Sequence, residues 1–333
     1  MSRGAAPMDL RTEYLGLALR TPFVVGASPL CDDVASARRL QEAGAGAVVL
    51  RSLFEEQIDL PASAPVSPVA DTQEGEQMFP DYAEYQFSPE AYVRHVVRLK
   101  RELAIPVIVS LNGHQLHGWA EVARRMERAG ADAIELNFYQ VVADPATAAD
   151  HVEMEMLRIT GDVAGSVKIP VAVKLSPFHS SMAQLAVALE LVGAAGVVVF
   201  NRFYQPDIDI DELTVRPMLR LSEPQELLLR LRWLAILSPL LRGSLAVTGG
   251  VHRDADAAKA ILAGAHAVQL VSVLLRHGPG VLTSMVHGLT AWMEVHGFSN
   301  LSECRGRLNL ERCGDAAAFE RANYIRTLQS WRG

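Results

Sequence analysis

The chain has 333 residues, and 50% of them are hydrophobic, which is enough to build a large buried core. Asp and Glu number 38 against 31 Lys and Arg, and the net charge of -7 argues against a nucleic-acid partner. No apolar run of about 18 residues predicts a membrane span, and the first residues lack the apolar stretch of a signal peptide. Cys31, Cys304 and Cys313 show no paired or metal-binding spacing, so we expect free thiols in a cytoplasmic protein.

A short sequence motif, in which a helix is predicted to end and a strand to begin, occurs four times. It occurs at residues 43–50 (AGAGAVVL), 129–136 (AGADAIEL), 192–199 (VGAAGVVV) and 263–270 (AGAHAVQL). In each repeat a glycine can take the left-handed conformation that ends a helix, and a buried apolar run follows. Each interval is long enough for two strand–helix units, so these strands are predicted to be the even-numbered ones.

Four further apolar runs, bounded by Pro or Gly, lie at residues 23–26, 106–112, 170–176 and 245–250. Amphipathic helices are predicted between the strands, for example at residues 33–43, 89–103, 118–129 and 254–263. Strict alternation of eight strands and eight helices predicts an α/β fold with a single (β/α)8 TIM barrel. An open doubly wound sheet is the rival, although no G-x-G-x-x-G follows the first strand.

Three segments extend this barrel, and we expect residues 1–333 to form one domain. Residues 10–14 and 17–19 resemble an N-terminal hairpin, and a C-terminal helical extension is predicted at residues 315–328. The loop at residues 52–88 is long enough to suggest a role at the active-site face. Aromatic residues gather near its end, namely Phe79, Tyr82, Tyr85 and Phe87.

Polar and small residues gather at the predicted carboxyl ends of the strands, where barrels of this kind place their active sites. They are Ala27, Ser28, Arg51, Asn112, Asn137, Lys174, Asn201, Arg202, Gly249, Gly250 and Ser272. The three asparagines can bind the edge of a flat heterocycle without adding charge, or each can cap its own loop. The glycine pair and Ser272 follow the seventh and eighth strands, where this fold commonly binds phosphate; a tight turn is the alternative.

Lys174 is the one cation within these apolar strands. Strand alternation in VAVKLSP turns its side chain into the barrel mouth. Burying an ammonium group without an anion or acceptor is costly, so we expect a ligand partner. Lys174 could lie beside an electron-rich cofactor ring or form a Schiff base.

Over nearly its whole length the chain resembles the dihydroorotate dehydrogenase family of FMN enzymes. The resemblance rests on L-x-x-x-Y-L-G-L-x-L-x-x-P-F-V-V-G-A-S at residues 10–28, E-L-N at 135–137, V-K-L-S-P at 173–177 and T-G-G-V at 248–251. It implies FMN as the cofactor and a homodimer. The FMN contacts that it implies are Ala27, Ser28, Arg51, Asn112, Asn137, Lys174, Gly249, Gly250 and Ser272.

The chain departs from this family at the substrate positions. Gln140 stands where the family has the Cys or Ser base, and an amide cannot act as a base near neutral pH. The second Asn of that motif and the family's N-S-x-G-x-x-N substrate loop are absent, and Arg51 replaces a usual Lys. The cofactor positions match while the substrate positions differ.

The leading hypothesis is an FMN-dependent oxidoreductase that exchanges hydride between flavin N5 and a small planar substrate, either pyrimidine-like or unsaturated. Substrate contacts are expected from Asn137, Asn201, Arg202 and Tyr204. Tyr139 is either the proton carrier or a packing aromatic, and the alternative acids are His114, His117 and His179.

Three other hypotheses stay open. The chain could be a true dihydroorotate dehydrogenase of pyrimidine biosynthesis with a relocated base. It could be a Schiff-base lyase using Lys174, or a barrel without catalytic activity. A separate electron-transfer partner is also left open, because no cysteine cluster in this chain could hold an iron–sulfur centre.

Overall fold

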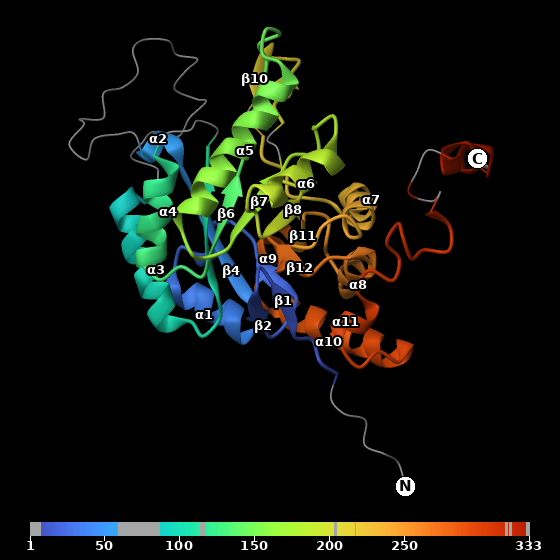
Figure 1. Cartoon of the computed structure of the whole chain (residues 1–333). Helices are drawn as coiled ribbons and strands as arrows, with labels where there is room; N and C mark the ends of the chain where they lie inside the picture. The colour runs from blue at the N-terminus through green and yellow to red at the C-terminus, as the bar shows by residue number, and fades with distance from the viewer. Residues whose placement is uncertain are drawn as a thin grey trace.

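The predicted barrel is confirmed. The computed structural model describes residues 8–58, 87–113, 118–202, 205–216, 218–316, 319 and 322–330. Eight parallel strands close in the order β11-β12-β3-β4-β5-β6-β7-β8 (Figure 1). They are β3 (Phe23–Val25), β4 (Ala47–Phe54), β5 (Val107–Asn112), β6 (Ala133–Asn137), β7 (Val171–Leu175), β8 (Gly196–Val199), β11 (Ser244–Thr248) and β12 (Ala267–Leu270).

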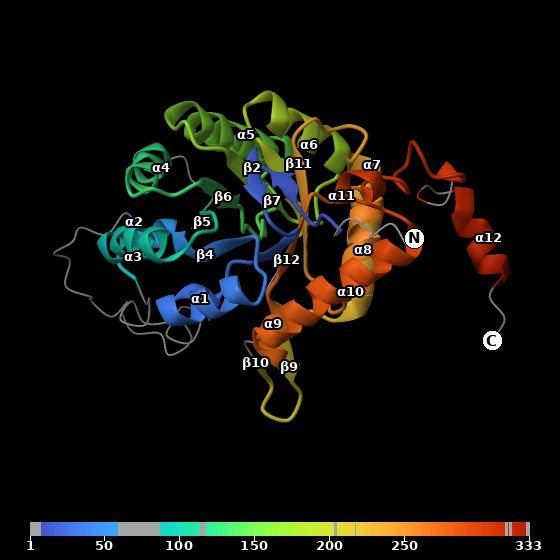
Figure 2. The same cartoon turned by 90° about the horizontal axis from the view of Figure 1, so that it is seen from below.

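Helices surround the barrel (Figure 2). They are α1 (Val34–Glu42), α2 (Glu55–Ile58), α3 (Pro89–Glu102), α4 (Trp119–Arg128), α5 (Ala149–Ser166), α6 (Met182–Leu191), α7 (Leu227–Leu237), α8 (Asp254–Ala263), α9 (Ser272–His277), α10 (Gly280–His296), α11 (Leu301–Cys304) and α12 (Ala322–Ser330). The glycine of each repeated motif has a positive φ between 94° and 125°, as the sequence predicts. These glycines are Gly44, Gly130, Gly193 and Gly264.

The buried apolar residues form two separate cores. The larger one lies between the strands and the surrounding helices. The smaller one fills the barrel interior at its amino-terminal end, where Tyr14, Leu15 and Leu19 pack against inward-facing strand residues. These three residues belong to the predicted hairpin, β1 (Thr12–Tyr14) paired with β2 (Leu17–Leu19), which lies at the lower end of the barrel in Figure 1. The hairpin therefore plugs the end of the barrel opposite the strand carboxyl termini.

Small strand residues make room for this plug. Alanines face it at positions 47, 133, 172, 246 and 267. At Gly196 a Cβ atom would come within 2.6 Å of the Leu15 side chain and 2.7 Å of the Ser244 carbonyl oxygen. The Leu15 amide also donates to the Ser244 hydroxyl across 2.8 Å, which fixes the hairpin to the strand.

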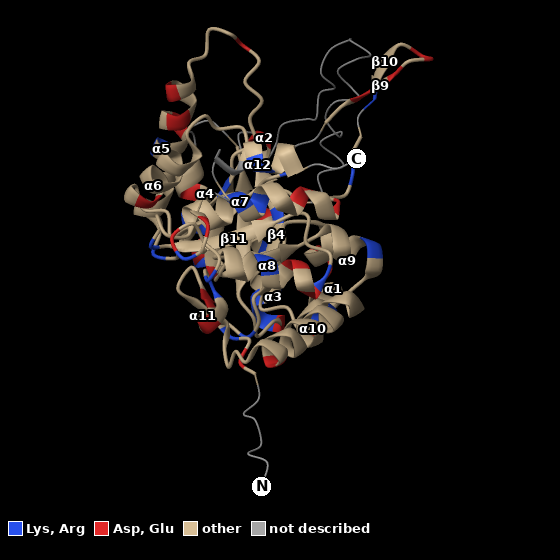
Figure 3. Ribbon diagram, turned by 90° about the vertical axis from the view of Figure 1, so that its right-hand side faces the viewer, with Lys and Arg blue, Asp and Glu red and all other residues tan. Residues whose placement is uncertain are grey.

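A second antiparallel ribbon, β9 (Asp207–Asp209) with β10 (Thr214–Arg216), follows β8 and extends away from the barrel (Figure 3). Its turn is acidic, with Asp211 and Glu212, and Asp209 ends the strand before it. Ion pairs from Arg216 to Asp209 and from Arg220 to Asp207 hold the ribbon.

Two predicted boundaries were wrong. Strand β4 runs to Phe54 and α2 follows directly, so Ser52 belongs to a strand rather than to the long loop. In the C-terminal extension α12 begins at Ala322, and Asp315 is not helical. Phe79, Tyr82, Tyr85, His114, His117 and Tyr204 lie outside the described residues. No helix among the described residues is both long and apolar enough to span a membrane.

We predict that Tyr14→Ala removes most of the plug's stabilising contact. Tyr14 is fully buried, and truncating a buried aromatic ring costs about 3–5 kcal/mol of unfolding free energy. Urea denaturation should show this loss, whereas Glu13→Ala, at an exposed position of the same strand, should change stability by about 0.5 kcal/mol or less. Equal effects of the two substitutions would contradict the packing role of the hairpin.

Candidate active site

A cavity of about 480 Å³ lies at the carboxyl ends of the strands, and we call it the mouth cavity. Its volume falls within the roughly 300–1,000 Å³ that small-molecule sites occupy. Each of the eight strands, or the residues directly after it, contributes to the lining. The predicted site residues that line it are Ala27, Ser28, Arg51, Asn112, Asn137, Tyr139, Lys174, Asn201, Arg202, Gly249 and Ser272.

Lys174 forms a buried ion pair at the base of this cavity. Its Nζ lies 3.3 Å from Oε1 of Glu135, and Gln269 Nε2 donates to the other carboxylate oxygen across 2.5 Å. Glu135 and Gln269 are each only 1% exposed. The neighbouring strand therefore supplies a carboxylate to Lys174, and the ligand partner expected for this lysine stays a prediction.

Two buried amides in the cavity have polar atoms without a partner. Oδ1 of Asn137 and Nδ2 of Asn201 make no hydrogen bond within the described part of the chain. Leaving such a buried group unpaired costs about 1–3 kcal/mol. One atom accepts and the other donates, so together they suit a ligand edge that carries both N–H and C=O groups.

Several predicted cofactor residues also hold the local structure. The Ser28 hydroxyl donates to the Gly26 carbonyl oxygen across 2.9 Å. The Ser272 hydroxyl accepts from the Ser222 amide at 2.9 Å, which ties the segment after the β9–β10 ribbon to the end of β12. Arg51 pairs with Asp32 at 2.7 Å. Ser28, Arg51 and Ser272 thus face the cavity from positions already fixed by hydrogen bonds.

The two predicted phosphate glycines differ in position. Both have a positive φ, 84° at Gly249 and 79° at Gly250, which favours glycine. Gly249 lines the mouth cavity, whereas Gly250 packs against the start of α7, where a Cβ atom would meet the Leu227 nitrogen at 2.4 Å. A Cβ atom at Gly249 would meet the Arg230 guanidinium at 2.8 Å. Besides the positive φ angles, close packing against α7 and its Arg230 therefore favours glycine at positions 249 and 250.

Gln140 does not join the other predicted residues. It is exposed and lines a separate hollow of about 520 Å³, together with Phe138, Glu153 and His179. There His179 Nδ1 lies 4.0 Å from a Glu153 oxygen, and burial lowers the pKa of this histidine. Tyr139, one residue earlier, faces the mouth cavity.

Comparison with known proteins agrees with this arrangement. The sequence model of the family described as dihydroorotate dehydrogenase matches residues 9–293. The chain belongs to the dihydroorotate dehydrogenase family. It is therefore an oxidoreductase of the dihydroorotate dehydrogenase type.

Known relatives cover most of the chain. The "Dihydroorotate dehydrogenase B (NAD(+)), catalytic subunit" of Thermoplasma volcanium is 26% identical over 86% of this chain and 94% of its own. The protein of the same name from Methanocella arvoryzae is 29% identical over 84% and 91%. The "NAD-dependent dihydropyrimidine dehydrogenase subunit PreA" of Escherichia coli is 24% identical over 86% of this chain and 73% of its own.

Sequence reasoning missed Glu135 and Gln269 as functional neighbours of Lys174. The signal was present in the sequence. Glu135 stands two residues before the inward-facing Asn137, so both side chains lie on the same face of the strand, and Gln269 interrupts the apolar run AVQL. Ser222, Glu226 and Arg230 also shape this part of the dihydroorotate dehydrogenase-like barrel. They lie in a loop and in a helix start, where no periodicity marks them.

We predict that Lys174→Met lowers the unfolding free energy by about 3–5 kcal/mol, because it leaves the Glu135 charge buried and unpaired. The double variant Lys174→Met/Glu135→Leu should recover a large part of that loss. Lys100→Met, which breaks the partly exposed pair with Asp132, serves as the control and should cost about 1 kcal/mol or less. Additive losses in the double variant, measured by urea denaturation, would contradict a coupled pair.

Proposed function

We propose that the chain is an FMN-dependent oxidoreductase whose substrate is a planar, unsaturated molecule other than dihydroorotate. The observation that carries the proposal is the composition of the mouth cavity. The predicted cofactor residues line it, except Gly250, while the position of the family's base faces another hollow.

The residues of the mouth cavity fit FMN. The unpaired Asn137 acceptor suits the N–H group that lies between the two C=O groups of an isoalloxazine edge. Lys174 places a positive charge in the same cavity, and Gly249 allows close backbone approach near the end of β11. When bound, FMN supplies hydride transfer at its N5 atom.

The residues of this chain would orient the reactants and move a proton. Tyr139 is the phenol closest along the chain to the replaced base, and its side chain lines the mouth cavity. We infer that its hydroxyl carries the proton that accompanies hydride transfer. Asn201 and Arg202, which follow strand β8 and also line the mouth cavity, would position the substrate.

The environment of Lys174 disfavours the Schiff-base alternative. A Schiff-base lysine must present a neutral amine to a carbonyl group. The ion pair with buried Glu135 suits a fixed positive charge instead. The names of the three relatives described above contain the word subunit, which supports the proposal that this chain too works with a separate partner subunit.

We predict that FMN binds the apoprotein and that Asn137→Leu raises its dissociation constant by about tenfold, because one buried hydrogen bond is lost. Quenching of FMN fluorescence measures the affinity. Gln140→Leu is the matched control, since this side chain lies three residues away but outside the mouth cavity, and it should leave the affinity unchanged. Failure of the wild-type protein to bind FMN would refute the proposed function.

We also predict that dihydroorotate, added without oxygen, leaves the FMN absorbance of the loaded protein unchanged. Gln140→Cys should not create this activity, because the side chain at position 140 faces the separate hollow. Dithionite should bleach the same sample, which shows that the flavin is reducible. Bleaching of the wild type by dihydroorotate would instead support a dehydrogenase with a relocated base.

A further inference from the structure

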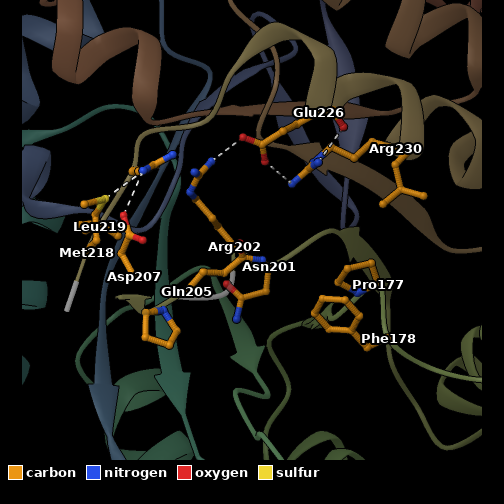
Figure 4. A pocket seen from close by; sticks show the side chains of 13 residues that line it. Pro177, Phe178, Asn201, Arg202, Gln205, Asp207, Met218, Leu219, Glu226 and Arg230 are labelled. Atoms are coloured by element: carbon orange, nitrogen blue, oxygen red, sulfur yellow. Dashed lines mark hydrogen bonds and ion pairs between the residues drawn. The ribbon is translucent and has the colours of Figure 1, made fainter. Parts of the chain in front are cut away.

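A second large hollow adjoins the mouth cavity, and we call it the arginine hollow. It has a volume of about 620 Å³ and lies among the segments that follow β7 and β8, the ribbon and the start of α7 (Figure 4). The two spaces share four lining residues, namely Asn201, Arg202, Leu219 and Arg220. A ligand that reaches past Asn201 from the mouth cavity would therefore enter the arginine hollow.

The charges that line the arginine hollow do not balance. Its arginines are Arg202, Arg220 and Arg230, and its carboxylates are Asp207 and Glu226. Among the described lining residues, three guanidinium groups stand against two carboxylates, so one positive charge is left over. A ligand that carries a single negative charge would neutralise it.

Arg230 is not available to such a ligand. It is buried, its Nε donates to the Thr248 carbonyl oxygen, and its Nη1 donates to the Glu226 carbonyl oxygen at 2.7 Å. The Glu226 carboxylate lies between Arg230, at 3.8 Å, and Arg202, at 2.7 Å (Figure 4). The Arg202 guanidinium binds Glu226 through Nη1 and has further N–H donors for a ligand.

Exposed apolar side chains form another part of the wall of the arginine hollow, which also includes the polar Gln205. Phe178 and Leu219 are 70% and 79% exposed, and Leu229 is 43% exposed. Pro177 and Pro206 extend the same wall. Large apolar side chains gathered in one hollow indicate a binding surface for an apolar group.

A buried polar atom lies where the two spaces meet. Nδ2 of Asn201 has no partner within the described residues, and Asn201 is 9% exposed and lines both spaces. An occupant that crosses this junction would supply the missing acceptor.

From these observations we propose that the substrate is an extended monocarboxylic acid. Its unsaturated end lies in the mouth cavity, its apolar middle contacts Phe178, Leu219 and Leu229, and its carboxylate binds Arg202 with help from Arg220. A carboxylate carries one negative charge, which matches the excess, whereas a phosphate monoester carries nearly two. This inference rests on the proposed function, because the reacting end must meet the flavin.

The test compares phenylalkanoic acids of increasing chain length with their neutral amides, by calorimetry on the FMN-loaded protein. We expect affinity to rise with chain length until the ligand spans both spaces. The acid should bind about tenfold to a hundredfold more tightly than its amide, as a charge-assisted hydrogen bond to arginine implies. The aromatic end should also perturb the flavin absorbance spectrum.

Variants at Arg202 test whether the carboxylate of the ligand binds this arginine. Arg202→Gln should abolish the preference for the acid, and Arg202→Lys should keep part of it because the charge is retained. Arg232→Gln is the matched control, since Arg232 is exposed on α7 and does not line the arginine hollow. A far-ultraviolet circular dichroism spectrum and a urea unfolding midpoint equal to those of the wild type show that the barrel is folded in each variant.

Equal binding of acid and amide to a protein that holds FMN would overturn this inference and leave the proposed function intact. So would a Gln variant that weakens acid and amide to the same degree. Tighter binding of a phenylalkyl phosphate than of the matching acid would also overturn the choice of carboxylate. Failure to bind FMN at all would remove the proposed function, and this inference with it.

Discussion

Closure of eight parallel strands is the constraint on which the rest of this structure depends. Because all strands run in one direction around a closed ring, their carboxyl ends meet at one rim. Residues from Ala27 to Ser272 are brought together there. At the opposite rim the hairpin fills the space that small residues leave, so the barrel has one open end and one sealed end.

The fold could be read from the sequence because its determinants are local and repeated. A glycine that ends a helix before an apolar run marks every second strand, and each of these glycines has the expected positive φ. Most of the mouth cavity could also be predicted, since strand ends define it. The Lys174–Glu135 pair could not, because it depends on the register between β6 and β7, which places residues from adjacent strands side by side. The arginine hollow is formed by loops and a helix start, where residue spacing carries no geometric information.

The side chains around the rim include residues that match the family's motifs and residues that differ from them. Asn137 and Lys174, which face the mouth cavity, belong to the E-L-N and V-K-L-S-P segments on which the resemblance to the family rests. Gln140, where the chain departs from the family, points elsewhere. The departures thus include Gln140, which faces the separate hollow, and Arg51, which lines the mouth cavity together with Asn137, whose buried Oδ1 lacks a partner among the described residues.

Glu226 connects two regions that are otherwise separate. Its carboxylate touches Arg202, and both its carboxylate and its carbonyl oxygen touch Arg230, which binds Thr248 directly before Gly249. A ligand that competes for Arg202 changes how strongly Glu226 is held by Arg230. The occupants of the two spaces would then share one ionic network, and thermodynamic linkage requires each to alter the affinity of the other by the same factor. Cofactor retention and substrate choice would therefore be coupled properties of this barrel, so neither could change without a response in the other.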